Sequence, residues 1–159
     1  MIEKPDWLPE LLPVIPFQTD QTIDLLYEVF KRDFVESQPC YRGHTVWFFP
    51  EKARGKELIF WHLTQRNFNK PGERFDSERS ERLPWARFML DNPDQPELLD
   101  WDYEDGDGTI KTYLWLKDYD YLVILKKYPD GGRRLLTAYW IEYQNEKRKL
   151  QKKYEQRRQ

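Results

Sequence analysis

Three side chains that could handle protons or bind an anion stand out in the sequence: His62, Thr137 and Tyr139. Thr137 and Tyr139 lie two residues apart in RLLTAYWIEY, a segment typical of a strand, and residues two apart on a strand share a face. Their hydroxyls can donate hydrogen bonds to an anion without a metal. His62, in the apolar run FWHL, has a near-neutral reference pKa and could shuttle a proton. Their structural interpretation is that of two ordinary strand residues and a hydrogen-bonded core histidine.

Basic residues near these positions could neutralise a phosphate. If residues 56–66 form a helix, His62 and Arg66 lie one turn apart on one face and could approach the same phosphate. An arginine fork binds phosphate at two points and stays charged. Three further arginines fall in the next predicted helical segment: Arg79, Arg82 and Arg87. Their structural alternative is salt bridging with Glu78 and Glu81 on the helix surface.

The first part of the chain predicts helices and one short strand. After a Pro-rich, irregular lead-in at residues 1–18, apolar residues recur at three- and four-residue spacing and predict an amphipathic helix that Pro39 ends. Residues 44–49 are typical of a short strand. Residues 56–66 could form a strand or a short helix, since apolar runs of this length are ambiguous. A second helical segment begins after a cap at Asp76 or Ser77.

From Leu98 onward the apolar period changes to two. Four strands are predicted, at residues 98–103, 109–116, 121–128 and 133–140, and the short turns between them predict an antiparallel β-meander. A mixed-charge helix follows at residues 142–158. On the last strand, Leu135, Thr137 and Tyr139 are expected on one face and Leu136, Ala138 and Trp140 on the other. The fold class is therefore α+β, with N-terminal helices, a four-stranded meander and a C-terminal helix.

Length and composition indicate one domain spanning residues 1–159. We divide it into an N-terminal helical and strand extension at 1–55, a core at 56–143 and a C-terminal helix at 144–159. The single cysteine, Cys40, excludes an internal disulfide and a cysteine zinc site. The sequence has neither a glycine-rich phosphate loop nor a paired metal-ligand motif, so we expect no cofactor and no metal. It has no membrane-length apolar run and no signal peptide, so we expect a cytoplasmic protein.

The net charge is −2, but the charges are unevenly distributed. Basic residues in the segment 52–87 and in the C-terminal helix could form a patch for RNA, or could be solvated surface. The acidic segment 97–107 could hold Mg²⁺ in a metal-dependent nuclease, although solvated charge on a hairpin is the simpler interpretation. Cys40 and His62 could also form a nucleophile–base pair, but no sequence signal brings them together.

Several of these features together resemble the barnase–EndoU–colicin–RelE (BECR) superfamily of RNases, and especially its phage- and toxin-associated branch in bacteria. They are the helical N-terminal part, the histidine in FWHL, the helix ending in WARFMLDNPD, the four-stranded meander and the TAY of the last strand. The resemblance covers roughly residues 56–143. It implies metal-independent RNA cleavage, in which the ribose 2′-hydroxyl attacks the adjacent phosphate and leaves a 2′,3′-cyclic phosphate.

The resemblance also implies roles for individual residues. His62 would be the general base or acid, and Thr137 and Tyr139 would hold the scissile phosphate or assist proton transfer. Arg66 or Arg87 would offset the charge that develops on the phosphorane. Further candidate substrate contacts are Arg82, Trp85, Lys111 and Trp115. The expected partners are an RNA substrate and an antitoxin or immunity protein, with no membrane.

Two other classes of function remain open from the sequence. One is a non-catalytic RNA- or protein-binding module on the same scaffold, in which Trp61, Trp85 and Trp115 would supply stacking surfaces. The other is the metal-dependent nuclease that would use the acidic segment. Cleavage that persists in EDTA would favour the metal-independent RNase, and binding without a cleavage product would favour the module.

Overall fold

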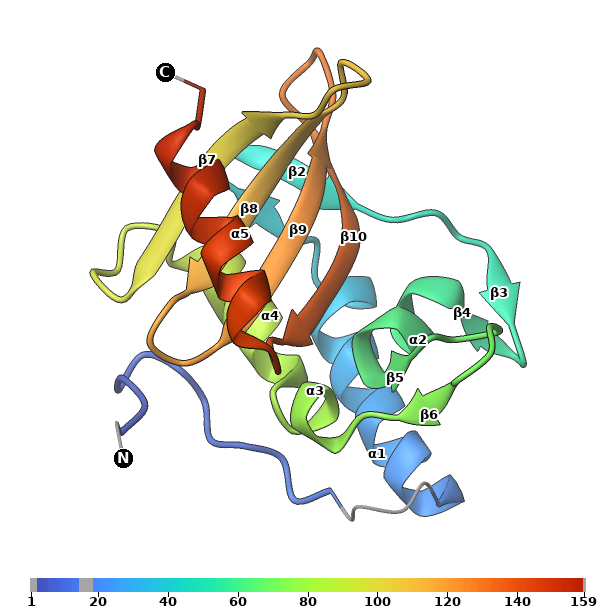
Figure 1. The fold of residues 1–159 in the computed structure, drawn as a ribbon. Coiled ribbons are helices and arrows are strands. Elements are labelled where there is room, and N and C mark those ends of the chain that lie inside the picture. Colours follow the sequence, from blue (N-terminus) through green and yellow to red (C-terminus); the bar gives the residue numbers. More distant parts are fainter. Residues whose placement is uncertain (1–2, 15–18, 159) are drawn as a thin grey trace.

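The described residues, 3–14 and 19–158 of a computed structural model, include a six-stranded mixed β-sheet (Figure 1). Its strands, in spatial order, are β1 (Cys40–Tyr41), β2 (His44–Trp47), β10 (Arg133–Trp140), β9 (Tyr121–Lys127), β8 (Ile110–Leu116) and β7 (Leu98–Glu104). Each strand from β7 to β10 pairs antiparallel with the next, whereas β2 runs parallel to β10. The predicted α+β class is confirmed, and the sheet is wider than the four strands expected because the segment before residue 56 adds β1 and β2.

Helices precede and follow the long strands. They are α1 (Asp20–Phe30), which continues as a π-helical turn at Lys31–Val35, then α2 (Leu58–Thr64), α3 (Ser77–Glu81), α4 (Leu83–Asp91) and α5 (Gln144–Glu155). Hydroxyl and carboxylate caps fix two of the starts: Thr19 accepts from the Thr22 N–H and Asp76 accepts from the Arg79 N–H. The segment 56–66, which the sequence left open between strand and helix, is mainly the helix α2.

Two short ribbons flank α2. β3 (Lys52–Ala53) pairs with β4 (Lys56–Glu57) before the helix, and β5 (Gln65–Arg66) pairs with β6 (Arg74–Phe75) after it. These pairs fix both ends of a helix of only seven residues, which is too short to be stable on its own. The loop from 67 to 73 between β5 and β6 is therefore held close to the end of α2.

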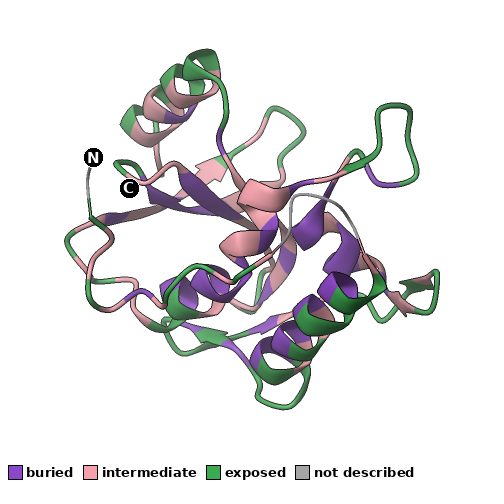
Figure 2. Cartoon of the chain, turned by 90° about the horizontal axis from the view of Figure 1, so that it is seen from below, coloured by how far each residue is buried: buried purple, intermediate pink, exposed green. Residues whose placement is uncertain are grey.

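The sheet has a hydrophobic cluster on each face. Leu114, Val123 and Leu125 point to the face covered by α1, α2 and α4, whereas Trp115 and Leu122 point to the face covered by α5. Figure 2 shows that the buried residues line the inward sides of the helices and the strands, with exposed residues outside. Leu8 of the lead-in is 2% exposed and joins the first cluster, while residues 15–18 of the lead-in lie outside the described residues.

A β-bulge in β10 changes which of its residues share a face. Leu135 pairs with Leu125, but Thr137 pairs with Ile124, the next residue along β9, so Leu136 is left without a partner. Leu135 and Ala138 consequently face the α1–α2–α4 side, and Thr137 and Tyr139 face the α5 side. The expectation that Thr137 and Tyr139 share a face is confirmed. The expectation that Leu135 lies on that face is wrong, because simple alternation does not hold through a bulge.

The second half of β10 is free of a neighbouring strand on one side. β2 pairs only with Arg133 and Arg134, and beyond them α2 and α3 contact β10 in its place (Figure 1). Side chains from the end of α2 and from the loop that follows it can therefore meet those of Thr137 and Tyr139.

None of the helices in the described part of the chain has both the length and the apolar character needed to span a membrane.

Candidate functional site

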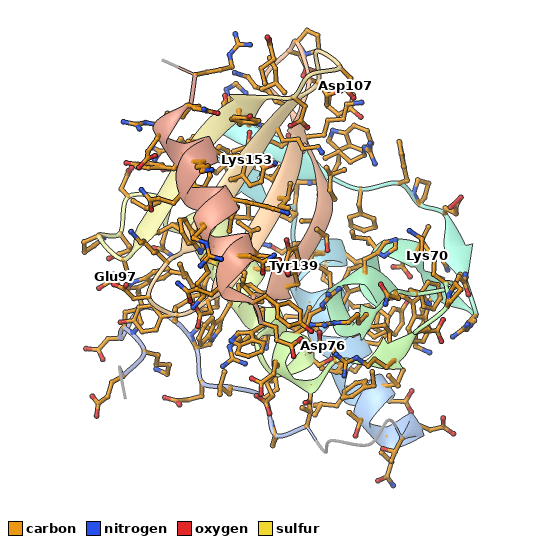
Figure 3. All side chains as sticks on the ribbon, in the orientation of Figure 1. Lys70, Asp76, Glu97, Asp107, Tyr139 and Lys153 are labelled. Atoms are coloured by element: carbon orange, nitrogen blue, oxygen red, sulfur yellow. The ribbon has the colours of Figure 1, made fainter. Side chains whose placement is uncertain are left out.

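A surface hollow of about 240 Å³ lies where α2, the loop after β5, α3 and β10 meet. The side chains that line it and can do chemistry are His62, Arg66, Lys70, Arg79, Thr137 and Tyr139. Figure 3 labels two of them, Tyr139 on β10 and Lys70 on the loop between β5 and β6. The structure thus brings together four of the five residues expected to be catalytic, from segments more than 70 positions apart in the sequence.

His62 lies near the C-terminal end of α2 and is half-buried. Its ring meets that of Phe68 edge-on, with centroids 6.3 Å apart, which orients the imidazole at the rim of the hollow. Burial lowers the pKa of His62 from its ordinary value, and the nearby charges of Arg79 and Lys70 lower it further. The imidazole is therefore neutral at neutral pH and can accept a proton.

Tyr139 and Thr137 present the two hydroxyls of the site. Burial raises the pKa of the Tyr139 phenol to about 12, so the phenol remains a proton donor at neutral pH. The Arg79 guanidinium carbon lies 5.4 Å from the centre of the Tyr139 ring, a cation–π distance that holds the ring in place. Thr137 is half-buried on the same face of β10 and adds a second donor.

Arg79 joins α3 to the end of α2. Its Nη1 donates to the carbonyl oxygens of His62, at 2.7 Å, and of Gln65, at 2.8 Å. These carbonyls belong to the last turn of α2 and the residue after it, where a helix leaves acceptors without internal partners. Because Arg79 satisfies both, it fixes the backbone that carries His62, while its guanidinium adds positive charge beside the hollow.

Asp76 holds two arginines in place from behind the hollow. Its Oδ2 lies 3.5 Å from Nε of Arg79 and 3.6 Å from Nε of Arg66. Arg66 also donates from Nη1 to Glu142, at 2.8 Å, at the far end of β10. Among the described residues, no carboxylate lines the hollow itself. The surface that a bound group would meet is therefore cationic and rich in hydrogen-bond donors, as an anion such as phosphate requires.

The structure places Arg87 outside this site. Its Nη1 donates to the carbonyl oxygens of Asp33, at 2.6 Å, and Ser37, at 3.2 Å, and its Nε pairs with Asp91 on the next turn of α4. Arg87 therefore connects α4 to the end of the first helix. Its expected role at the phosphate is wrong, because α4 lies on the other face of the sheet from Thr137 and Tyr139.

The proposed stacking tryptophans are core residues. Trp61, Trp85 and Trp115 are 5%, 3% and 1% exposed, so none presents a ring face on which a base could stack. Trp85 instead donates its indole N–H to the Pro9 carbonyl of the lead-in. Sequence spacing could not separate these rings from surface rings, since a large apolar side chain serves both uses.

The other expected substrate contacts lie apart from the hollow. Arg82 packs over the rings of Trp85 and Trp140 and pairs with Glu78. This is the salt bridging that the sequence offered as the alternative to phosphate binding. Lys111, on β8, lies on the same sheet face as Thr137 but two strands away, and pairs with Asp105 at 3.0 Å. Neither lines the hollow.

Four of the six carboxylates of the acidic segment are paired with basic side chains, including Asp105 with Lys111. Asp100 binds Arg42, Asp102 binds Lys127, and Glu104 binds Arg158. Within the described ranges, no group of three or more His, Cys, Asp or Glu side chains is arranged to hold a metal ion. Cys40 is exposed on β1 at the edge of the sheet and does not line the hollow with His62.

Lys70 and Arg79 line the hollow beside the expected residues. Lys70 was not expected there from the sequence, whereas Arg79 was one of three arginines considered for neutralising a phosphate. The sequence could not separate Arg79 from Arg82 and Arg87, because its position three residues after the Asp76 cap indicates only a local helix start. Lys70 lies in a polar loop and is exposed. Their placement depends on the packing of α2 and α3 against β10, which no local pattern encodes.

No protein-family model matches the chain, and neither a curated protein nor a solved structure is significantly similar to it. The assignment of a function therefore depends on the chemistry of the hollow.

Proposed function

We propose that this protein is a metal-independent endoribonuclease that cleaves RNA by attack of the 2′-hydroxyl on the adjacent phosphate, leaving a 2′,3′-cyclic phosphate. The observation that carries the proposal is the convergence in one cationic hollow of a neutral imidazole, His62, with two hydroxyl donors, Thr137 and Tyr139. Phosphoryl transfer without a metal needs a proton acceptor, a proton donor and fixed positive charge. The hollow offers all three.

The pKa shifts assign the direction of proton transfer. His62, whose pKa is lowered, takes the proton of the 2′-hydroxyl as the oxygen attacks phosphorus. Tyr139, whose pKa is raised to about 12, gives its proton to the departing 5′-oxygen, which is far more basic than a phenolate. The proton held by His62 is then released to solvent and Tyr139 is reprotonated from solvent. One P–O bond forms, one breaks, and the enzyme returns to its starting state.

The remaining groups stabilise the phosphorane. Thr137 donates its hydroxyl to a non-bridging oxygen, and Arg66, Lys70 and Arg79 supply positive charge. The order of elements, with helices first and then β7 to β10 each antiparallel to the next, supports the BECR-like architecture. On this proposal the protein is a toxin-like enzyme of the phage-associated bacterial branch, acts in the cytoplasm on cellular RNA, and is restrained by an antitoxin or immunity protein.

The test is incubation of the purified protein with total RNA in EDTA, followed by identification of the product ends. We expect cleavage with 2′,3′-cyclic phosphate ends, and we expect His62→Ala and Thr137→Val to abolish it. His44→Ala and Thr45→Val are matched controls, since both residues are exposed on β2 away from the hollow. Intact RNA with the native protein, or ends other than cyclic phosphate, would contradict the proposal.

The pairing of the arginines favours a second candidate, the non-catalytic binding module. Arg66 is paired with Glu142, and Arg79 with Asp76 and two carbonyls, so part of their charge is already satisfied before a phosphate arrives. Salt-dependent RNA binding in the same assay without any product would identify this function.

A further inference from the structure

The sheet face that carries Thr137 and Tyr139 continues beyond the hollow into a row of basic residues. Lys111 on β8, Lys126 on β9 and Arg134 on β10 are paired neighbours across the three strands, and Arg134 is paired in turn with Trp47 on β2. Paired residues on adjacent strands point to the same face. In the view of Figure 1, α5 crosses β7 and β8 and leaves the start of β10 beside β2 uncovered.

Three aromatic rings lie with this row. The Trp47 ring is 5.3 Å from that of Tyr128 and 5.5 Å from that of Phe49, measured between centroids. None of the three belongs to either hydrophobic cluster of the described residues, and Phe49 is 53% exposed. We call this surface the basic–aromatic strip, defined by Trp47, Phe49, Lys111, Lys126, Tyr128 and Arg134.

Two of the three cations of the strip lie over its rings. The Arg134 guanidinium carbon is 4.1 Å from the centre of the Phe49 ring, and Lys126 Nζ is 5.3 Å from that of Tyr128. Arg134 also donates from Nε to the Tyr128 hydroxyl, at 3.0 Å. In the part of the chain that is described, Lys111 has a carboxylate partner, Asp105, whereas Lys126 and Arg134 have none. Their charge remains available to an anionic ligand.

The bulge at Leu136 joins the strip to the hollow. In a regular strand, Arg134 and Thr137 are three positions apart and point to opposite faces. Because Leu136 is left out of the pairing, both point to the α5 side. At ~3.3 Å per residue, Arg134 then lies roughly 7–10 Å from Thr137 along β10. A chain with a phosphate in the hollow could therefore run along β10 onto the strip.

We propose that the basic–aromatic strip binds the single-stranded RNA that extends from the hollow, with bases stacked on Trp47 and Phe49 and phosphates held by Lys126 and Arg134. The inference rests on the proposed function, because the phosphate placed in the hollow sets the direction in which the RNA runs along β10. Accessible rings interleaved with cations are the combination that single strands require, because every base has a face to stack and every nucleotide a negative charge. A duplex cannot use the rings in this way, since its bases are already stacked and paired.

The test uses fluorescent single-stranded oligonucleotides with 2′-O-methyl riboses, which cannot undergo 2′-hydroxyl attack. The full-length protein is titrated against a trinucleotide, which fills only the hollow, and a decanucleotide, which also reaches the strip. We expect Trp47→Ala and Phe49→Ala each to weaken decanucleotide binding by about 5- to 100-fold and to leave trinucleotide binding unchanged. Arg134→Gln should weaken decanucleotide binding and reduce the slope of log K against log salt by about 0.7.

Matched controls come from surfaces away from the strip. Phe88→Ala removes an exposed ring from α4, on the other side of the sheet, and Lys149→Ala removes an exposed positive charge from α5. Neither should change decanucleotide affinity, and the melting temperature of every variant is measured to show that it is folded. Unchanged decanucleotide affinity in folded Trp47→Ala and Phe49→Ala proteins would overturn the proposal. Equal affinity for a ten-base-pair duplex, or equal competition by polyglutamate of the same charge, would also overturn it.

The design separates this inference from the proposed function. If the variants lose decanucleotide binding but the native protein never cleaves RNA, the strip stands as an RNA-binding surface and the nuclease proposal fails. If the native protein cleaves RNA with cyclic phosphate ends but the strip variants bind like the native protein, the nuclease proposal stands and the strip proposal fails.

Discussion

Arg79 is hydrogen-bonded to the backbone of His62, with its Nη1 atom 2.7 Å from the carbonyl oxygen of the histidine. The same nitrogen reaches the carbonyl of Gln65, and Nε lies 3.5 Å from Asp76. One largely buried guanidinium thus satisfies carbonyl oxygens at the end of α2, pairs with the cap of α3 and adds charge to the hollow. The proton acceptor of the proposed reaction is held in position by a residue from another helix.

Arg79→Met should destabilise the protein by about 2–4 kcal/mol, because two partly buried carbonyl oxygens lose their charged donor and Asp76 loses a cationic partner. Urea unfolding measures the free energy of unfolding directly. Arg79→Lys keeps the charge but cannot reach both carbonyls in the same planar geometry. It should therefore lose some stability, but less than Arg79→Met. A methionine variant as stable as the native protein would show that water replaces the guanidinium at the end of α2.

The cleavage rate should rise with pH as His62 loses its proton. Because burial and two nearby cations lower the pKa of His62 below its ordinary value of 6.5, the midpoint of the rise should lie below pH 6.5. The pKa of Tyr139 is about 12, so the rate should then remain level through neutral pH. Initial rates at fixed ionic strength test this, and a midpoint above 6.5 would contradict it.

The same pKa shift makes stability depend on pH. In the unfolded chain the histidine binds a proton near its ordinary pKa of 6.5, whereas the folded protein takes that proton only at lower pH. The unfolded state therefore binds more protons in this window, and the stability contributed by His62 is lost as pH falls below about 6.5. His62→Gln should flatten this part of the pH–stability curve, as measured by the denaturant midpoint at each pH. An unchanged curve would assign the dependence to other groups.

Tyr139→Phe should separate chemistry from packing. The ring remains beside Arg79 and only the hydroxyl is lost, so the melting temperature should change little. If the phenol donates the proton to the leaving oxygen, the cleavage rate should fall by about 10²–10⁴-fold. Tyr143→Phe is the matched control, since Tyr143 is 53% exposed and does not line the hollow. Equal rates for the two variants would remove Tyr139 from the mechanism.

Arg87→Met should lower stability without changing the chemistry. The substitution removes donors from the carbonyls of Asp33 and Ser37 and should cost about 1–3 kcal/mol. The cleavage rate per folded molecule should equal that of the native protein, because Arg87 lies outside the hollow. A lower cleavage rate in a variant as stable as the native protein would return Arg87 to the site.

The bulge in β10 predicts unequal effects for two adjacent leucines. Leu135 is 2% exposed and packs in the larger cluster, so Leu135→Ala should cost about 2–5 kcal/mol. Leu136 is unpaired and partly exposed, so Leu136→Ala should cost clearly less. Urea unfolding of the two variants makes the comparison, and equal losses would mean that Leu136 also occupies a core position.

The sequence by itself determined the features that depend on neighbours along the chain. Period-two alternation located β7 to β10, since every second residue of a strand meets the same environment. A cap at Asp76 or Ser77 located the start of the second helical segment, because a side-chain acceptor must lie within one turn of the N–H groups it satisfies. The common face of Thr137 and Tyr139 followed from their spacing, and it holds because both lie beyond the bulge.

Only the tertiary structure decided which residues meet across the chain. It paired the end of α2 with the free side of β10, brought Arg79 and Lys70 to His62, and placed Arg87 on the other face of the sheet. It also buried Trp61, Trp85 and Trp115 while leaving Trp47 and Phe49 outside both clusters. The bulge at Leu136 put Arg134 and Thr137 on one face, which strict alternation forbids. Periodicity records the environment of a residue relative to its neighbours, whereas contacts between distant segments depend on how their surfaces pack.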